Sequence, residues 1–204
     1  MQIRELAVPD SYVVTPRIHT DDRGSFLEFY RHDRLAGVVG HALDLRQANT
    51  SISRRGTFRG IHFADTPPGQ AKYVTVVRGA VMDFVVDLRV GSPTFGAWEG
   101  VRLDDVERRA VYLSEGLGHA FLALEDETVV TYLVSDVYNP SAEHAVDPLD
   151  ESIGLELPIP AAELFLSEKD REAPSLADAL ERGILPNWQK ARAWYAELDA
   201  RVKG

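Results

Sequence analysis

The stretch KYVTVVRGAVMDFVVDLR, residues 72–89, decides the fold class of this chain. Two runs rich in valine, Lys72 to Val77 and Val81 to Leu88, flank the dipeptide Arg78-Gly79. Short β-branched runs on either side of a glycine are typical of paired strands, because glycine accepts the backbone angles of a tight turn. We therefore predict two β-strands joined as a hairpin.

The same pattern extends outward from this stretch. From about residue 11 to residue 138, Gly, Pro, Asp and Asn separate short segments rich in Val, Ile, Thr, Tyr and Phe, and Thr128 to Val134 is a further strong strand. Sheets of this kind must bury one face against another layer, which predicts an all-β body. A sandwich, a jelly roll and a small barrel all fit, since periodicity does not distinguish them.

The end of the chain changes character. Ser175 followed by Asp178 resembles a capping box at the start of SLADALERG, and Gly183 is a natural stop. From Asn187 onward the apolar residues have helical spacing. We predict two short helices packed against the β body.

Composition narrows the classes of function. The chain has 204 residues, of which 45% are hydrophobic and 26% charged, as in an ordinary globular protein of one main domain. Its formal charge of -10 argues against nucleic acid as a partner. It has no cysteine, which excludes disulfides, thiolate metal sites and a cysteine nucleophile, and no apolar run long enough to cross a membrane. We expect a cytoplasmic protein.

Strand parity identifies polar residues that share a face with apolar ones. Lys72, Asp83 and Tyr132 each have the parity of valines on their own strand. The opposite faces are nearly as apolar, so parity leaves open which face is the interior. In QANTSISRRGTFRGIHF, residues 47–63, Gln47 and Asn49 begin a polar face. Such a face is more typical of a solvated sheet, and the alternative is a wet, ligand-binding cavity.

His62 in RGIHF and His119 in EGLGHAF are isolated histidines. Either one fits a core or surface histidine bonded to backbone. A metal site at His62 is disfavoured because no His-x-His pair or second histidine lies near it in the sequence. Lys72 also fits an edge-strand charge and Tyr132 a rim aromatic. Together, a histidine, a lysine and a tyrosine without a nucleophile motif or phosphate loop indicate proton transfer.

Five blocks occur in order along the chain: DDRGSFLEFY (21–30), QANTSISRRGTFRGIHF (47–63), PPGQAKYVTVVRGAVMDFVVDLRVGSPTFGAWEGV (67–101), YLSEGLGHAFLALEDETVVTYLVSDVY (112–138) and LSEKD (166–170). Together they resemble the dTDP-4-dehydrorhamnose 3,5-epimerase family of the cupin superfamily, and the match runs from about residue 12 to residue 186. The resemblance implies a jelly-roll body and a dTDP-4-keto-6-deoxyhexose substrate handled without metal or organic cofactor. It also implies a homodimer whose N-terminal segment reaches the partner's site. We accordingly divide the single domain, 1–204, into an N-terminal segment (1–30), a jelly-roll body (31–170) and C-terminal helices (171–204).

The resemblance also implies a role for individual residues. His62 would be the general base, Asp170 its carboxylate partner, Lys72 the cation near the enolate oxygen and Tyr132 the acid on the opposite face. Two arginines, Arg23 and Arg59, would hold the pyrophosphate, and Tyr138 would stack on thymine. The remaining nucleotide- or sugar-contacting positions are Glu28, Gln47, Asn49, His119, Glu143 and Lys169.

The blocks SPTFGAWEGVRLDD and PPGQAKY, and the sequence HAVDPLDESIGLELP after Glu143, are closer to the branch that serves deoxysugars of antibiotics and other natural products. Some members of that branch invert one carbon only. We therefore expect inversion at C3, at C5 or at both. The alternatives are a metal-dependent cupin isomerase or oxygenase, and a non-catalytic cupin that binds sugar nucleotides.

Overall fold

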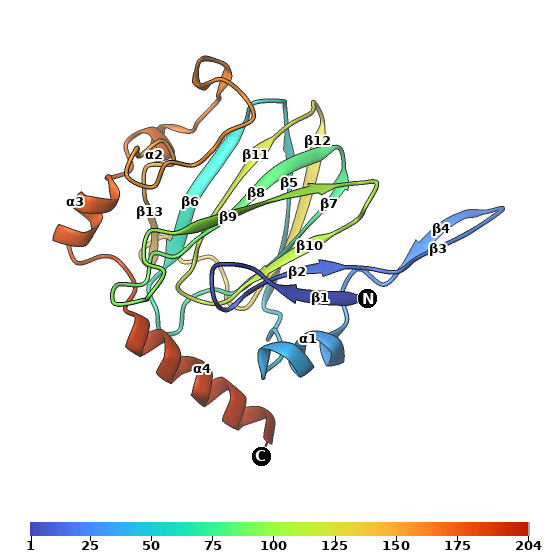
Figure 1. Cartoon of the computed structure of the whole chain (residues 1–204), viewed down its shortest axis with the longest axis horizontal. Helices are drawn as coiled ribbons and strands as arrows, with labels where there is room; N and C mark the ends of the chain where they lie inside the picture. Colours follow the sequence, from blue (N-terminus) through green and yellow to red (C-terminus); the bar gives the residue numbers. More distant parts are fainter. Residues whose placement is uncertain (204) are drawn as a thin grey trace.

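Two antiparallel β-sheets packed face to face form the body of the protein, for which a computed structural model describes residues 1–203 (Figure 1). The first sheet has six strands in the order β1 (Gln2–Glu5), β2 (Ser11–Thr15), β10 (Ala110–Leu113), β7 (Lys72–Arg78), β12 (Thr128–Val134) and β5 (Gln47–Ser53). The second has five, in the order β13 (Glu143–Ala145), β6 (Phe58–Ala64), β11 (Gly118–Ala123), β8 (Ala80–Val86) and β9 (Trp98–Asp104). The predicted all-β fold, a sandwich of the cupin-like jelly-roll type, is confirmed.

The predicted hairpin at residues 72–89 is wrong in its pairing. β7 lies in the six-stranded sheet and β8 in the five-stranded sheet, so the chain crosses between layers at Gly79. Gly79 has a φ of +77°, and a Cβ there would lie 2.5 Å from Thr128 Oγ1, so glycine is required at this crossing. Both runs are apolar on both faces, and such a pattern does not distinguish a hairpin from a change of sheet.

Three apolar clusters hold the layers together. The central one lies between the sheets and includes Val74 and Val76 of β7 with Val81 and Val85 of β8. A second covers the outer face of the five-stranded sheet, where Phe84 of β8 packs with residues of the segment after β13. A third lies on the outer face of the six-stranded sheet, beneath α1 (His32–Val39). Burial on both faces of the sheets explains why their strands are almost continuously apolar.

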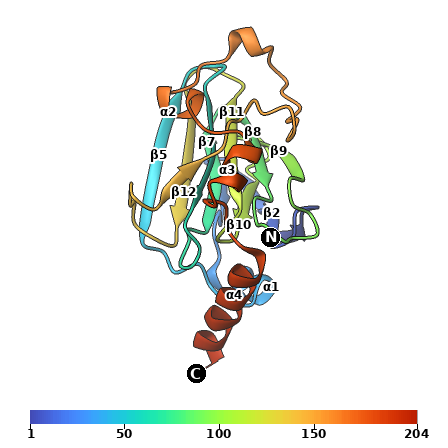
Figure 2. The same ribbon diagram turned by 90° about the vertical axis from the view of Figure 1, so that its left-hand side faces the viewer.

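The helices at the C-terminal end follow the predicted signals. α3 (Leu176–Glu181) begins after Ser175, whose side chain accepts a hydrogen bond from the backbone of Asp178, and α4 (Trp188–Lys203) follows. α4 lies beside α1 at one end of the body (Figure 2). Two helices were not predicted: α1 and the short α2 (Glu168–Arg171). A 3-10 turn at Ala161–Glu163 lies in the connection before α2.

The buried Arg89 ties α4 to the body. Its guanidinium donates to Asp87 at 2.9 Å and to Asp10 at 2.7 Å, and it lies 4.4 Å from the ring centroid of Trp188. Arg89 and Asp87 are fully buried, so the pairing satisfies charges that would otherwise be costly in the interior. The network therefore holds the start of α4 against the loops at this end of the sandwich.

The first 30 residues do not form one separate segment. β1 and β2 pair as the outer strands of the six-stranded sheet, so residues 2–15 belong to the body. Only the hairpin of β3 (Ile18–Asp21) and β4 (Gly24–Leu27) projects away from it (Figure 1). Within residues 1–203, no helix has the length and apolar character needed to cross a membrane.

Candidate active site

The six-stranded sheet presents Lys72 and Tyr132 on its inner face. Lys72 is buried, and Tyr132 packs against the apolar cluster between the sheets. The two strands are neighbours, with Tyr132 opposite Val74 and Val134 opposite Lys72. The face that Lys72 and Tyr132 share with their valine neighbours is therefore the inner one, a choice that alternation had left open.

The polar face of β5 points into the same region. Gln47, Asn49 and Ser51 are half-buried and Ser53 is buried, whereas the alternate residues are exposed, with Ile52 at 63%. The burial of this face contradicts the favoured interpretation of a solvated sheet, and the alternative of a wet, ligand-binding cavity stays a prediction. The cause is that the outer face of β5 is uncovered within this chain, a property set by packing and not by alternation.

β6 carries Arg59 and His62, whose spacing of three residues would put them on opposite faces of a regular strand. The pairing with β11 shifts register between them, so that His119 faces His62 while Phe121 faces Arg59. Such an irregularity restores a common face. Gly60 lies at the shift with a φ of +128°, and a Cβ there would overlap Ala120. Arg59 donates at 3.4 Å to Ser53 of the opposite sheet.

His62 is paired with Asp170 of α2. His62 Nε2 lies 2.6 Å from Asp170 Oδ1, and the side chains are 31% and 4% exposed. Burial alone would raise the pKa of Asp170, but the hydrogen bond and charge of His62, with a hydrogen bond from Ser167, hold that pKa below its usual value. His62 Nδ1 has no hydrogen-bond partner within residues 1–203, which leaves this nitrogen available to a ligand.

A second pair, His119 with Asp83, lies beside the first. His119 Nε2 is 2.8 Å from Asp83 Oδ2, and the side chains are 8% and 0% exposed. In the part of the chain that the structure describes, Asp83 Oδ1 has no hydrogen-bond partner. Asp83 was not among the candidate site residues, although its parity with two core valines was the signal that it faces inward.

Electrostatics places Glu143 and Lys169 close to the same groups. Burial lowers the pKa of Lys72; the carboxylates of Glu143 and Asp83 oppose this shift, and the charge of Lys169 adds to it. Burial and the charge of Glu143 raise the pKa of Tyr132, with Arg59 acting in the opposite direction. Glu143 comes from β13 and Lys169 from α2, so strands of both sheets and α2 contribute to one region.

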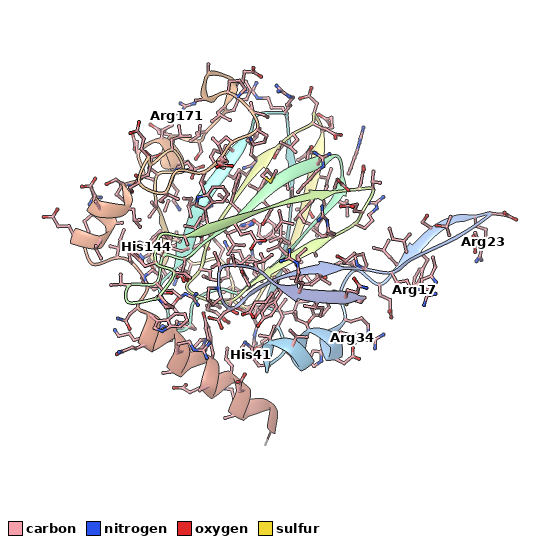
Figure 3. All side chains as sticks on the ribbon, in the orientation of Figure 1. Arg17, Arg23, Arg34, His41, His144 and Arg171 are labelled. Carbon is pink, nitrogen blue, oxygen red and sulfur yellow. The ribbon has the colours of Figure 1, made fainter. Side chains whose placement is uncertain are left out.

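Two predicted residues, Arg23 and Glu28, lie away from this region, and a third, Tyr138, lies at its rim. Arg23 is at the tip of the β3–β4 hairpin, 90% exposed and paired with Asp21, far from the body (Figure 3). Glu28 pairs with Arg31 at 3.1 Å near the base of that hairpin. Tyr138 is exposed, although its backbone N–H donates to Gln47 Oε1 at 3.0 Å and so places it at the rim of the site.

The assembled groups suit acid–base chemistry. An imidazole backed by a carboxylate lies on one sheet, while a buried ammonium and a phenol lie on the other, so a ligand between the sheets would meet a base and an acid from different sides. In residues 1–203, no three histidine or carboxylate side chains are grouped so that they could hold a metal ion.

Comparisons with known proteins agree with one another. The model of a family described as dTDP-4-dehydrorhamnose 3,5-epimerase matches residues 5–178. A dTDP-4-dehydrorhamnose 3,5-epimerase of Mycolicibacterium smegmatis is 52% identical over 97% of each chain, and a dTDP-4-dehydrorhamnose 3-epimerase of Streptomyces niveus is 53% identical over 95% of this chain and 92% of its own. The solved structure of the rmlC epimerase of Mycobacterium tuberculosis superposes with a TM-score of 0.95 at 47% identity, covering 97% of this chain and 100% of that one.

Proposed function

This chain belongs to the dTDP-4-dehydrorhamnose 3,5-epimerase family, and we propose that it epimerises a dTDP-4-keto-6-deoxyhexose at C3, C5 or both without a cofactor. The observation that carries this proposal is the His62–Asp170 pair, with His62 on one sheet of the sandwich and Lys72 and Tyr132 on the other. The carbons on either side of a ketone lose a proton readily, because the electrons left behind delocalise onto the carbonyl oxygen.

In the first step, Nδ1 of His62 takes the proton from the carbon next to the ketone. The C–H bond breaks and its electron pair moves into the ring, giving an enolate with negative charge on the former carbonyl oxygen. The carboxylate of Asp170 accepts a hydrogen bond from Nε2 and stabilises the imidazolium that forms. The ammonium of Lys72 lies in a buried environment, where a cation stabilises developing negative charge more strongly than in water.

In the second step, the Tyr132 hydroxyl gives a proton to the opposite face of the same carbon and the ketone reforms. A phenol is protonated at neutral pH and so has a proton to give; burial and the charge of Glu143 raise the pKa of Tyr132, which keeps the hydroxyl protonated until the carbanion accepts that proton. His62 and Tyr132 belong to different sheets, which supports delivery from opposite sides. For Tyr132→Phe we expect exchange of the substrate proton with solvent to survive better than net inversion, as seen by NMR in D2O.

Substrate binding in this proposal uses the polar inner surface and its rim. Arg59 binds the pyrophosphate, and charge-assisted contacts of this kind anchor an anion even in an acidic protein. Tyr138 stacks on the thymine. The contacts to sugar and nucleotide are assigned to Glu28, Gln47, Asn49, His119, Glu143 and Lys169.

The proposal includes a homodimer in which the β3–β4 hairpin completes the partner's site. Its support is that Arg23, assigned to the pyrophosphate, is at the exposed tip of a hairpin that leaves its own body. The hairpin also exposes Phe26 at 67%, an apolar side chain that a partner would cover.

Mixed dimers test this exchange. Arg23→Ala and His62→Ala are each inactive or weak alone, but a dimer of the two variants holds one site with both residues intact. Random reassortment after mild dissociation yields mixed dimers as about half of the population, so about a quarter of wild-type activity should return. No recovery, with mixed dimers verified by mass, would place Arg23 in its own site and overturn the exchange.

The reaction is tested by incubating the protein with dTDP-4-keto-6-deoxyglucose in D2O and following the ring protons by NMR. Deuterium at C3, at C5 or at both defines which carbons react, a point on which relatives of nearly equal identity differ. Absence of deuterium at both carbons, with related 4-keto sugars also inert, would overturn the epimerase proposal. The proposal includes a cytoplasmic location. No observation favours a metal-dependent cupin isomerase or oxygenase, or a non-catalytic cupin that binds sugar nucleotides.

A further inference from the structure

We infer that Ser167 is a positioning residue for the His62–Asp170 pair, an inference that rests on the proposed function. Ser167 Oγ donates to Asp170 Oδ2 at 2.8 Å, while Asp170 Oδ1 accepts from His62 at 2.6 Å. Each carboxylate oxygen therefore has a different side-chain partner. The Ser167 hydroxyl also accepts a hydrogen bond from the Asp170 backbone at 3.1 Å, which closes a compact ring at the start of α2.

The need for such a residue follows from where Asp170 comes from. It lies on a helix of only four residues, and 108 positions in the sequence separate it from His62. A carboxylate bonded through one oxygen can rotate about its last torsion, and the imidazole would turn with it. Fixing the second oxygen stops this rotation. The N–H at Nε2 of His62 then continues to donate to Asp170, and the lone pair of Nδ1 stays directed toward the substrate.

The chain contains a matched control for this effect. Ser175 caps α3 with the same local geometry: its Oγ donates to Asp178 Oδ2 at 2.8 Å and accepts from the Asp178 backbone at 3.1 Å. Within residues 1–203, however, Asp178 bonds no histidine. Removing either hydroxyl breaks an equivalent helix cap, but only Ser167 acts on the candidate active site.

The test compares Ser167→Ala, Ser167→Thr and Ser175→Ala. For Ser167→Ala we expect kcat to fall by about tenfold and KM to stay within about twofold, since an orienting partner acts on the chemical step. Ser167→Thr, which keeps the hydroxyl, should recover most of this loss. Ser175→Ala should retain kcat, with thermal stability lowered by about as much as in Ser167→Ala. Unchanged kcat in Ser167→Ala, or an equal loss in Ser175→Ala, would overturn the inference.

A spectroscopic measurement separates this inference from the proposed function. Nitrogen-15 NMR of His62 reports which ring nitrogen carries the proton, whether or not the protein turns over a sugar. We expect one dominant tautomer with the proton on Nε2 in wild type and in Ser175→Ala, and a mixture in Ser167→Ala. The same tautomer in all three proteins would reject Ser167 as a positioning residue even if the epimerase assay succeeds. A tautomer that shifts in Ser167→Ala, together with a wild-type protein that is inactive on the sugar, would support the positioning role and reject the reaction.

Discussion

Two neighbouring histidine–carboxylate pairs of this protein have nearly the same geometry, 2.6 Å for His62–Asp170 and 2.8 Å for His119–Asp83, yet they have different surroundings. The histidines are themselves neighbours, because His119 on β11 faces His62 on β6. His62 is 31% exposed, whereas His119 is 8% exposed and Asp83 is fully buried.

This difference separates two uses of the same side chains. Asp83 and His119 lie on adjacent strands of one sheet, so their pairing is part of the sheet's packing. Asp170 comes from α2, outside the sheet, and leaves one nitrogen of a partly accessible imidazole free. A partly exposed imidazole such as His62 can exchange a proton with a substrate, while a buried imidazole such as His119 serves better as a fixed hydrogen-bonding group.

Replacing each histidine in turn should give the largest contrast. For His62→Ala we expect deuterium exchange to fall by about a thousandfold or more, the upper range for loss of a general base, with dTDP binding nearly intact. His119→Ala should keep measurable exchange and weaken binding instead. Exchange rates by NMR and dTDP affinity by calorimetry measure the two effects. Retained turnover in His62→Ala would remove His62 from the role of base.

The charges of Glu143 and Asp83 both act on Lys72, and its replacement should separate activity from stability. Lys72→Met is expected to lower kcat by about 100-fold or more, because a preorganised cation near the enolate is lost. The folded state lowers the pKa of Lys72, so the charged form is disfavoured in the fold and stability rises as pH increases through that pKa. At neutral pH the variant should therefore melt higher, by roughly 2–4 °C for each kcal/mol gained. A lower melting temperature would show that the lysine's contacts outweigh its burial.

Replacing Asp83 by asparagine should mainly lower stability, whereas replacing Asp170 by asparagine should mainly lower activity. Asp83→Asn places an NH2 group in a fully buried position, and an unsatisfied polar group there costs about 1–3 kcal/mol, which calorimetry would detect. Asp170→Asn should destabilise the protein less than Asp83→Asn does, but should lower kcat more, by about tenfold or more. Equal melting temperatures with equal rates would contradict the distinction between the pairs.

Much of the fold was predictable because its signals are local. The capping box at Ser175 and the strand at Thr128–Val134 occur where the sequence placed them. The pairing of residues 72–89 was not predictable, because a glycine turn between two wholly apolar runs suits a crossing between sheets as well as a hairpin. α1 was missed for a related reason: its burial depends on a sheet face formed by distant strands.

The sequence by itself determined which side chains of regular strands share a face. Alternation has a period of two residues and needs no partner strand, so it showed that Lys72, Asp83 and Tyr132 each share a face with valines of their own strand, without showing that this face is the interior. Only the tertiary structure decided the rest. A register shift at Gly60 brings Arg59 and His62 to one face, and packing turns the polar face of β5 inward. Most of all, Asp170 meets His62 only because α2 docks on β6, a contact that no local pattern encodes.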